Sequence, residues 1–350
     1  MEFTKYNIQK EDTIESIATK HKISVNELLD FHNANSTLTQ QFFGSTIPIH
    51  IDELIVPLFL EKKEKGISDS VNFEQKARYR CEQTVVMKLN GIIHSHADTK
   101  REFVVEKRKT KNNQIVKIKL TENIIDAYQK QLELALKLVC EIDMIKSDVL
   151  VNLNQNGKIS NILNHNEIIQ KWHHKKNQYE NDFTFMRDSN SKQDFKNFLN
   201  ITDLQIVSEE NLINYLYSKL FFDVFFDKYL VNDNFLDDYS RTFYSQLFDG
   251  YAVKLNFTQN ILSESPSDVA IRKVSSFSKS DLDNEFLEKQ YDNKFKPIVK
   301  YRFSEYNFSV RERCIINTDE NWIESSDITI IEEVKNNVQV LIDYKLRKIE

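Results

Sequence analysis

Two histidines in one short alternating segment are the side chains with the best spacing for metal chemistry. In the segment IIHSHAD, His94 and His96 are two residues apart, so a β-strand would point both imidazoles to the same face. A catalytic zinc ion takes three protein ligands, with histidine among the common ones. Two histidines do not complete such a site, and the segment is better interpreted as solvent-facing histidines on an edge strand.

This pair resembles the His-x-His motif of zinc-dependent isopeptidases of the JAMM type. That family has a proline after the second histidine, followed at fixed distances by a serine and an aspartate. Ala97, Val104 and Lys107 occupy those positions here, so the third ligand is missing and a cation replaces it. We therefore expect neither a metal site nor a cofactor.

The other reactive side chains do not form a recognisable catalytic pattern. His173 and His174 are adjacent on an expected helix, where neighbours do not share a face, so a surface position is expected. Cys81, Cys140 and Cys314 are too widely spaced to indicate a disulfide framework or a zinc site, which favours a reducing compartment. Five glycines provide no phosphate-binding loop. We expect no enzymatic activity, with a wall hydrolase carrying an unrecognised catalytic domain as an alternative.

Length and charge restrict the remaining classes of function. A chain of 350 residues favours two or three domains. The 47 basic and 53 acidic residues are interspersed, which argues against a nucleic-acid partner because such a surface needs a basic stripe. The most apolar expected helix, residues 212–231, carries four charged side chains, too many for a membrane span. The first ten residues do not resemble a secretory signal, so a cytoplasmic protein is expected, with delivery to the cell envelope left open.

Residues 11–33 contain two short helical patterns in tandem. Asp12 with Glu15, and Ser24 with Glu27, have the three-residue spacing of a capping box. Apolar stripes follow at i, i+3, i+4 and i+7. Their members are Ile14, Ile17, Ala18 and His21 in the first helix, and Val25, Leu28, Leu29 and His32 in the second. Alternating segments at 6–8 and 47–49 predict two paired strands, giving a βααβ order.

This arrangement resembles the LysM family over about residues 5–51. The positions that match in order and spacing are Tyr6, Asp12, Thr13, Ile14, Ile17, Ala18, Ile23, Ser24, Val25, Glu27, Leu28, Gly44, Ile47 and Ile49. Glu11 and Lys22 replace two glycines that are usual in the family, Pro48 lies one position early, and the asparagine that ends the second helix is displaced to Asn33.

LysM modules typically bind polymers of N-acetylglucosamine, such as peptidoglycan or chitin, in a groove between two loops. The resemblance implies a groove for a glycan or a protein partner formed by Glu11, Asp12, Thr13, Ile14, Asn33, Asn35, Ser36 and Leu38. Asp12, Thr13 and Ile14 have a structural interpretation as well, since the same positions cap the first helix and fill the small core.

The rest of the chain predicts a larger α+β domain with an antiparallel sheet and helices. We assign residues 1–51 to the LysM module, 52–77 to a linker and 78–350 to this domain, which divides into sub-halves 78–200 and 201–350. One sheet or two are compatible with the pattern. Asn90-Gly91, Asn156-Gly157, Thr318-Asp319 and Asn336-Asn337 predict turns.

Several elements of this domain are predicted in detail. Helices are expected at 122–145 and 209–231, the second centrally buried. Strands are expected at 79–89, 101–108, 115–120, 251–258, 299–303, 310–317 and 338–346, with a hairpin over 149–163. The basic run at 107–111 is expected at a hairpin tip in solvent.

Three functions remain after these exclusions. The first is a non-enzymatic adaptor or structural accessory of a bacterial injection or secretion apparatus, because some LysM modules bind protein in contractile machines. The second is a cell-wall protein that binds peptidoglycan glycan strands. The wall hydrolase is the third. The sequence leaves open whether the groove recognises sugar or protein.

Overall fold

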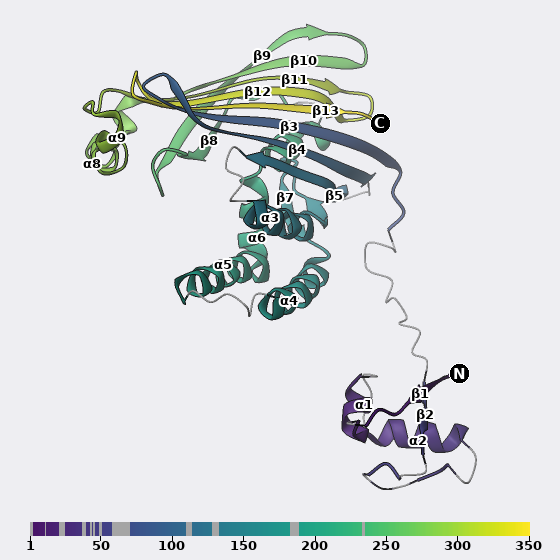
Figure 1. Cartoon of the computed structure of the whole chain (residues 1–350). Helices are drawn as coiled ribbons and strands as arrows, with labels where there is room; N and C mark the ends of the chain where they lie inside the picture. The colour runs from purple at the N-terminus through teal and green to yellow at the C-terminus, as the bar shows by residue number, and fades with distance from the viewer. Residues whose placement is uncertain are drawn as a thin grey trace. The chain divides into compact units, whose positions relative to one another are not determined.

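The chain folds into two compact units, Met1–Gly66 and Ile67–Glu350, each with its own hydrophobic core. The computed structural model (Figure 1) describes residues 3–10, 12–20, 25–36, 40–42, 44, 46–48, 51–57, 71–109, 114–127, 133–182, 189–232 and 235–350. An α+β fold with a small N-terminal unit and a larger antiparallel-sheet unit is confirmed.

The small unit has the expected βααβ order. Its elements are β1 (Phe3–Asn7), α1 (Ile14–Lys20), α2 (Val25–Asn35) and β2 (Glu53–Pro57). The two strands pair antiparallel, from Phe3 opposite Pro57 to Asn7 opposite Glu53. Ile14, Ile17 and Leu28 from the predicted helical stripes are almost fully buried, together with Leu54 and Val56 of β2.

The closing strand lies later in the chain than residues 47–49. After Glu53 its sequence is a continuous apolar run, and Leu54, Ile55 and Val56 are all buried. Pro48 lacks the N–H group that a strand residue needs for a ladder, and its carbonyl instead accepts a turn hydrogen bond from Ile51 N–H. The small unit therefore extends into the range expected to be a linker, of which residues 58–70 lie outside the described structure.

The described residues of the larger unit contain a single antiparallel sheet of 11 strands, in the order β7-β6-β5-β4-β3-β13-β12-β11-β10-β9-β8. The strands are β3 (Gln75–Leu89), β4 (Ile92–Lys109), β5 (Gln114–Ala127), β6 (Val149–Leu153), β7 (Ile159–Ile162), β8 (Tyr239–Tyr244), β9 (Ala252–Glu264), β10 (Asp268–Ser276), β11 (Tyr306–Asn317), β12 (Trp322–Val334) and β13 (Val338–Lys348). The sub-halves 78–200 and 201–350 are thus two halves of one sheet, joined where β13 pairs with β3.

Local turn chemistry produces the hairpins. Asn90 and Gly91 have φ angles of 52° and 79°, the left-handed pair that a two-residue hairpin turn requires. Asn336 takes the same conformation, with φ 66°, between β12 and β13. The sequence predicts a turn at each of these positions because asparagine and glycine tolerate positive φ.

Helices cover one side of the sheet and one end of its strands. They are α3 (Glu133–Lys146), α4 (His165–Asp182), α5 (Ser189–Val207), α6 (Glu209–Tyr217), α7 (Leu220–Phe225), α8 (Asn284–Lys294) and α9 (Lys296–Val299). Figure 1 shows α3, α4, α5 and α6 gathered on one side, with α8 and α9 at an end of the strands. None of the helices described is long and apolar enough to cross a membrane.

The centre of the larger unit is an aromatic cluster. Phe221, Phe222 and Phe225 of α7 are buried, and the Phe221 ring stacks on Phe103 of β4 with centroids 3.8 Å apart. Tyr79 of β3 packs edge-on against Phe225, with centroids 5.6 Å apart. The expected central burial of the segment 209–231 is confirmed.

Three predicted elements differ from the structure. Residues 122–127 belong to β5, not to a helix, because their backbone pairs with β4 as far as Ala127 opposite Ala97. The helix expected at 209–231 is divided into α6, α7 and a 3-10 turn at Lys228–Leu230. Residues 299–303 form no strand, since α9 ends at Val299 and Lys300 has a φ of 63°.

Lys107 is buried, contrary to the expectation of a solvent-exposed basic tip. Its side chain lies with the ammonium 3.5 Å from the centroid of the Trp322 ring. Lys107 Nζ donates hydrogen bonds to the carbonyl oxygens of Glu320 and Asn321, at 3.0 and 2.7 Å. The cation therefore binds the β11–β12 turn, while residues 110–113 lie outside the described structure.

The β6–β7 turn generates a stability prediction at Gly157. A Cβ at this position would lie 2.5 Å from the carbonyl carbon of Asp227 and closer still to its oxygen, and φ is +71°. We expect Gly157→Ala to lower the free energy of unfolding by at least about 3 kcal/mol, combining left-handed strain of about 1 kcal/mol with the cost of overpacking. Urea unfolding followed by tryptophan fluorescence measures this, because both tryptophans, Trp172 and Trp322, lie in the larger unit.

Gly91→Ala is the matched control. Gly91 has a φ of +79°, but a Cβ at this position would meet no heavy atom of the described residues within 4 Å. This variant should lose only about 1 kcal/mol, from backbone strain alone. Equal losses in the two variants would contradict a close approach of Gly157 to the Asp227 carbonyl.

Candidate functional site

Asp12 fixes the loop between β1 and α1. Its Oδ2 accepts hydrogen bonds from the Gln9 backbone N–H and from the Tyr6 hydroxyl, both at 2.8 Å. Lys20 Nζ lies 3.1 Å from the same hydroxyl and 4.7 Å from the centroid of the Tyr6 ring. The Gln9 and Tyr6 hydrogen bonds lower the pKa of Asp12 because they stabilise its ionised form. The carboxylate thus connects the strand to the loop.

Thr13 and Ser16 form the cap of α1. Thr13 N–H donates to Ser16 Oγ at 2.9 Å, and Ser16 N–H donates to Thr13 Oγ1 at 3.1 Å. The expected capping pair is Asp12 with Glu15, one residue earlier, but Asp12 is engaged by Tyr6 and Gln9. Ile14 follows the cap with 1% of its surface exposed and belongs to the small core.

Asn33 holds the second loop of the predicted groove. Its Nδ2 donates to the Phe42 carbonyl at 2.9 Å, and its Oδ1 accepts from the Phe42 N–H at 3.1 Å. Gln41 Nε2 donates to the carbonyl of Asn33 at 2.8 Å. The asparagine thereby attaches residues 41–42 to the end of α2.

The remaining predicted groove residues are Asn35, Ser36, Glu11 and Leu38, of which the structure describes the first two. Asn35 Nδ2 donates to the Phe31 carbonyl of its own helix at 2.8 Å. Ser36 Oγ is buried and has no hydrogen-bond partner among the residues that the structure describes. Glu11 and Leu38 lie outside those residues. The eight-residue groove stays a prediction, with five of its side chains engaged in internal contacts.

His32 connects three segments of the small unit, whereas the sequence pattern predicts only that it lies on the apolar stripe of the second helix. It is fully buried, its Nδ1 accepts the Ile55 N–H at 3.0 Å, and its Nε2 lies 2.9 Å from the Gln40 carbonyl. Because Nδ1 accepts, the proton is on Nε2, which donates to Gln40. The histidine joins α2, the second loop and β2, and its partners lie too far along the chain for helix periodicity to indicate them.

These contacts define what the two loops can offer a ligand. Side chains of Asp12, Thr13 and Asn33 bond to backbone or neighbouring side chains, so they hold the loops in place. The Thr13 backbone is engaged as well, since its N–H donates to Ser16 Oγ and its carbonyl accepts from the Ile17 N–H.

Replacement of His32 tests this frame. In His32→Leu the Ile55 N–H and the Gln40 carbonyl lose their buried partner, at a cost of about 1–3 kcal/mol for each unsatisfied group. We expect faster amide exchange across Glu53–Pro57, measured by hydrogen–deuterium exchange mass spectrometry on the full chain. Asn35→Ala is the control and should leave that exchange unchanged, since the Asn35 amide donates to its own helix. Unchanged protection in His32→Leu would contradict the bridging role.

The pH dependence of Asp12 gives a second test. Its pKa is lowered in the folded state, so it stabilises the small unit above its unfolded pKa of about 3.9. That stabilisation is lost as pH falls through the folded pKa. Asp12→Asn should therefore unfold at a lower temperature than wild type at pH 7, and the difference should shrink at a lower pH, below the unfolded pKa of about 3.9. NMR signals of residues 3–20, followed on heating, measure it. A difference that is undiminished at the lower pH would contradict the assignment.

The candidate histidines of the larger unit lie on two different elements, β4 and α4. His94 is exposed on β4, and His173 and His174 are exposed on α4. His94 and His96 are on a stretch of β4 that pairs with β3 but precedes the β5 ladder. No group of three or more metal-ligating side chains occurs in the described parts of the chain.

The three cysteine thiols are free and have raised pKa values. Burial raises the pKa of both Cys81 and Cys314 to about 12, and it also raises the pKa of Cys140. A thiol nucleophile needs a lowered pKa, so these groups are not activated.

Comparisons of the sequence with known proteins identify a family in the small unit. No curated protein matches the chain. This chain is similar to a solved structure entitled "Lipid-protein interactions in lipovitellin", with 10% sequence identity and a TM-score of 0.36. The similarity covers 79% of this chain and 25% of the lipovitellin chain. This chain spans about a quarter of that protein, and a similarity at this level carries no functional argument. Residues 6–37 match the LysM domain family. The small unit therefore contains a LysM domain, a module of the peptidoglycan- and carbohydrate-binding type.

Proposed function

We propose that this protein binds peptidoglycan glycan strands through its LysM domain and that the larger unit is a non-catalytic body attached to it. The match of residues 6–37 to the LysM family is the observation that carries the proposal. The separate core of the small unit supports it, because a recognition module must keep its shape independently of the body.

The geometry of the loops supports binding of a neutral sugar chain. Hydrogen bonds from the backbone N–H groups of Gln9 and Phe42 to Asp12 and Asn33 fix the loops before any ligand arrives, which reduces the ordering cost of binding. The proposed contacts come from backbone amides and carbonyls of the two loops other than those of Thr13, with aliphatic atoms covering the sugar face.

The non-catalytic role of the larger unit is part of the same proposal. Its thiols have raised pKa values, and no group of three or more metal-ligating side chains occurs among the residues that the structure describes. The free cysteines are compatible with synthesis in a reducing, cytoplasmic compartment. We propose that the protein acts at the cell envelope after delivery there.

A second candidate function is an adaptor of a bacterial injection or secretion apparatus, with protein partners. One surface feature favours it. Ile201, Leu204 and Val207 of α5 are 56%, 67% and 49% exposed and lie three residues apart, so they form an apolar stripe. Exposed apolar stripes on soluble proteins are commonly interaction sites.

Sedimentation with purified peptidoglycan sacculi tests the proposal. We expect the wild-type chain to pellet with sacculi and Thr13→Arg to bind at least about tenfold more weakly, because a long cation would occupy the groove beside the loop backbone. Thr19→Arg is the matched control, since Thr19 is exposed on α1, the helix that Thr13 caps, but lies outside the predicted groove. This variant should pellet like wild type.

Two results would contradict glycan binding. The first is wild-type protein that stays in the supernatant, and the second is equal binding by the two threonine variants. Amide exchange of the small unit in both variants separates a lost contact from an unfolded module. Co-purification with tail, baseplate or spike proteins in place of sacculi would favour the adaptor.

A further inference from the structure

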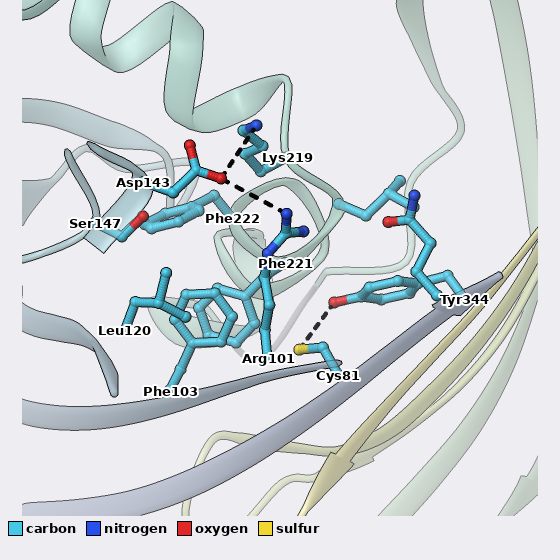
Figure 2. Close-up of a pocket in the computed structure, with 12 residues that line it drawn as sticks. Cys81, Arg101, Phe103, Leu120, Asp143, Ser147, Lys219, Phe221, Phe222 and Tyr344 are labelled. Carbon is cyan, nitrogen blue, oxygen red and sulfur yellow. Dashed lines mark hydrogen bonds and ion pairs between the residues drawn. The ribbon is translucent and has the colours of Figure 1, made fainter. Parts of the chain in front are cut away.

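A small cavity lies between the sheet and the helices of the larger unit (Figure 2). Arg101 of β4, Asp143 of α3 and Lys219, in the connection between α6 and α7, line it. Cys81 and Tyr344 lie at its sheet side, where the tyrosine hydroxyl donates to the Cys81 sulfur at 3.2 Å. Three elements distant in sequence therefore contribute charged groups to one place.

The charges around this cavity do not balance. Arg101 and Lys219 both face the single carboxylate of Asp143, which is 4% exposed. Lys146, one turn after Asp143 on α3, is 3% exposed and donates to Gln205 Oε1 at 2.6 Å. Three cations thus share one carboxylate, leaving a net charge of about +2 in a largely buried region.

Neighbouring groups do not correct this imbalance. Glu141 pairs with Lys175 at 2.9 Å, and Asp223 pairs with Arg241, so each of these carboxylates has its own cation. The thiols of Cys81 and Cys140 and the hydroxyls of Tyr215 and Tyr344 have raised pKa values and are neutral at pH 7. Burial lowers the pKa of Lys146 to about 8 and also lowers that of Lys219, and the Asp143 carboxylate opposes both shifts.

The cationic groups also have donors to spare. Arg101 Nε donates to Asn123 Oδ1 at 3.0 Å, but its Nη2 is 3.6 Å from Asp143 Oδ2. Lys219 Nζ is 3.7 Å from the same oxygen. Both distances exceed that of a direct hydrogen bond, so N–H groups of the arginine and the lysine can reach a third acceptor. Figure 2 shows both side chains directed toward Asp143 from different sides of the cavity.

The size of the cavity limits this acceptor. Its volume is about 20 Å³, little more than the roughly 10–15 Å³ that a single water molecule requires. Phosphate, sulfate and organic carboxylates are larger. A monatomic anion fits and supplies the negative charge that water lacks. Lys219 keeps 31% of its side-chain surface exposed, which gives an ion a path from solvent.

We propose that this cavity is a binding site for a monatomic halide ion, chloride under physiological conditions, held by Arg101 and Lys219. The ion links β4 to the α6–α7 connection and stabilises the contact between the sheet and its helices. Asp143 positions both cations and does not contact the anion, because like charges repel.

Thermal unfolding of the full chain in different salts tests this site. At constant ionic strength, we expect the unfolding temperature to rise with chloride or bromide and to saturate, while gluconate, which is too large for the cavity, has no such effect. Lys219→Met should weaken bromide binding at least about tenfold, since it removes one charged donor. Lys171→Met is the matched control: Lys171 pairs with Asp148 on the surface of α4, so the halide effect should remain.

Crystals soaked in bromide give a second readout that does not depend on the stability of a variant. An anomalous peak between Arg101 and Lys219 is the expected result. The proposal is overturned if that position shows no bromide, or if chloride and gluconate change the unfolding temperature equally. An unchanged bromide affinity in Lys219→Met would overturn it as well.

Discussion

The antiparallel pairing of β3 with β13 is the constraint on which the larger unit depends. Its register runs from Leu89 opposite Val338 to Tyr79 opposite Lys348. Two further hydrogen bonds extend it, from Arg78 N–H to the Glu350 carbonyl and from Ile349 N–H to the Arg78 carbonyl. Within β3–β7 and within β8–β13 each strand pairs with the next one along the chain, with α3 inserted between β5 and β6 and with α8 and α9 inserted between β10 and β11. The β3–β13 ladder makes the two groups a single sheet. Without this ladder the sheet would divide into two smaller sheets, each with an additional unpaired edge strand. The aromatic core would then no longer pack against a continuous sheet.

The same ladder determines how the rest can assemble. Hairpins such as β3–β4 close over two residues and lose little loop entropy, whereas β3 and β13 are brought together from opposite ends of the unit. Long-range pairing of this kind is slow compared with hairpin formation. The cluster around Phe221 is where both halves meet, because Tyr79 of β3 and Trp322 of β12 pack on the same helix α7. Helix burial and sheet closure therefore depend on each other.

The features that the sequence predicts correctly are those encoded by near neighbours. Asn90-Gly91 encodes its turn, and the spacing of Ile14 and Ile17 encodes the buried face of α1. The prediction for Lys107 is wrong because Trp322 and the carbonyls that bind it are more than 200 residues away. Residues 122–127 form a strand because β4 is available as a partner, which helical spacing cannot indicate. The candidate groove stays a prediction. Asn33 bonds to the Phe42 backbone, a contact that depends on the path of the chain after α2 and that residue type and order do not indicate.

The two units stabilise their charged side chains in different ways. In the small unit the Asp12 carboxylate accepts hydrogen bonds from Tyr6 and Gln9, which hold the loop between β1 and α1. In the larger unit Arg101 and Lys219 come together only when the helices pack on the sheet. The excess of positive charge then lowers the stability of the packed state. An ion that binds only the packed state offsets this cost by an amount that rises with its concentration. The strength of the contact between the sheet and its helices would therefore follow the halide concentration around the protein.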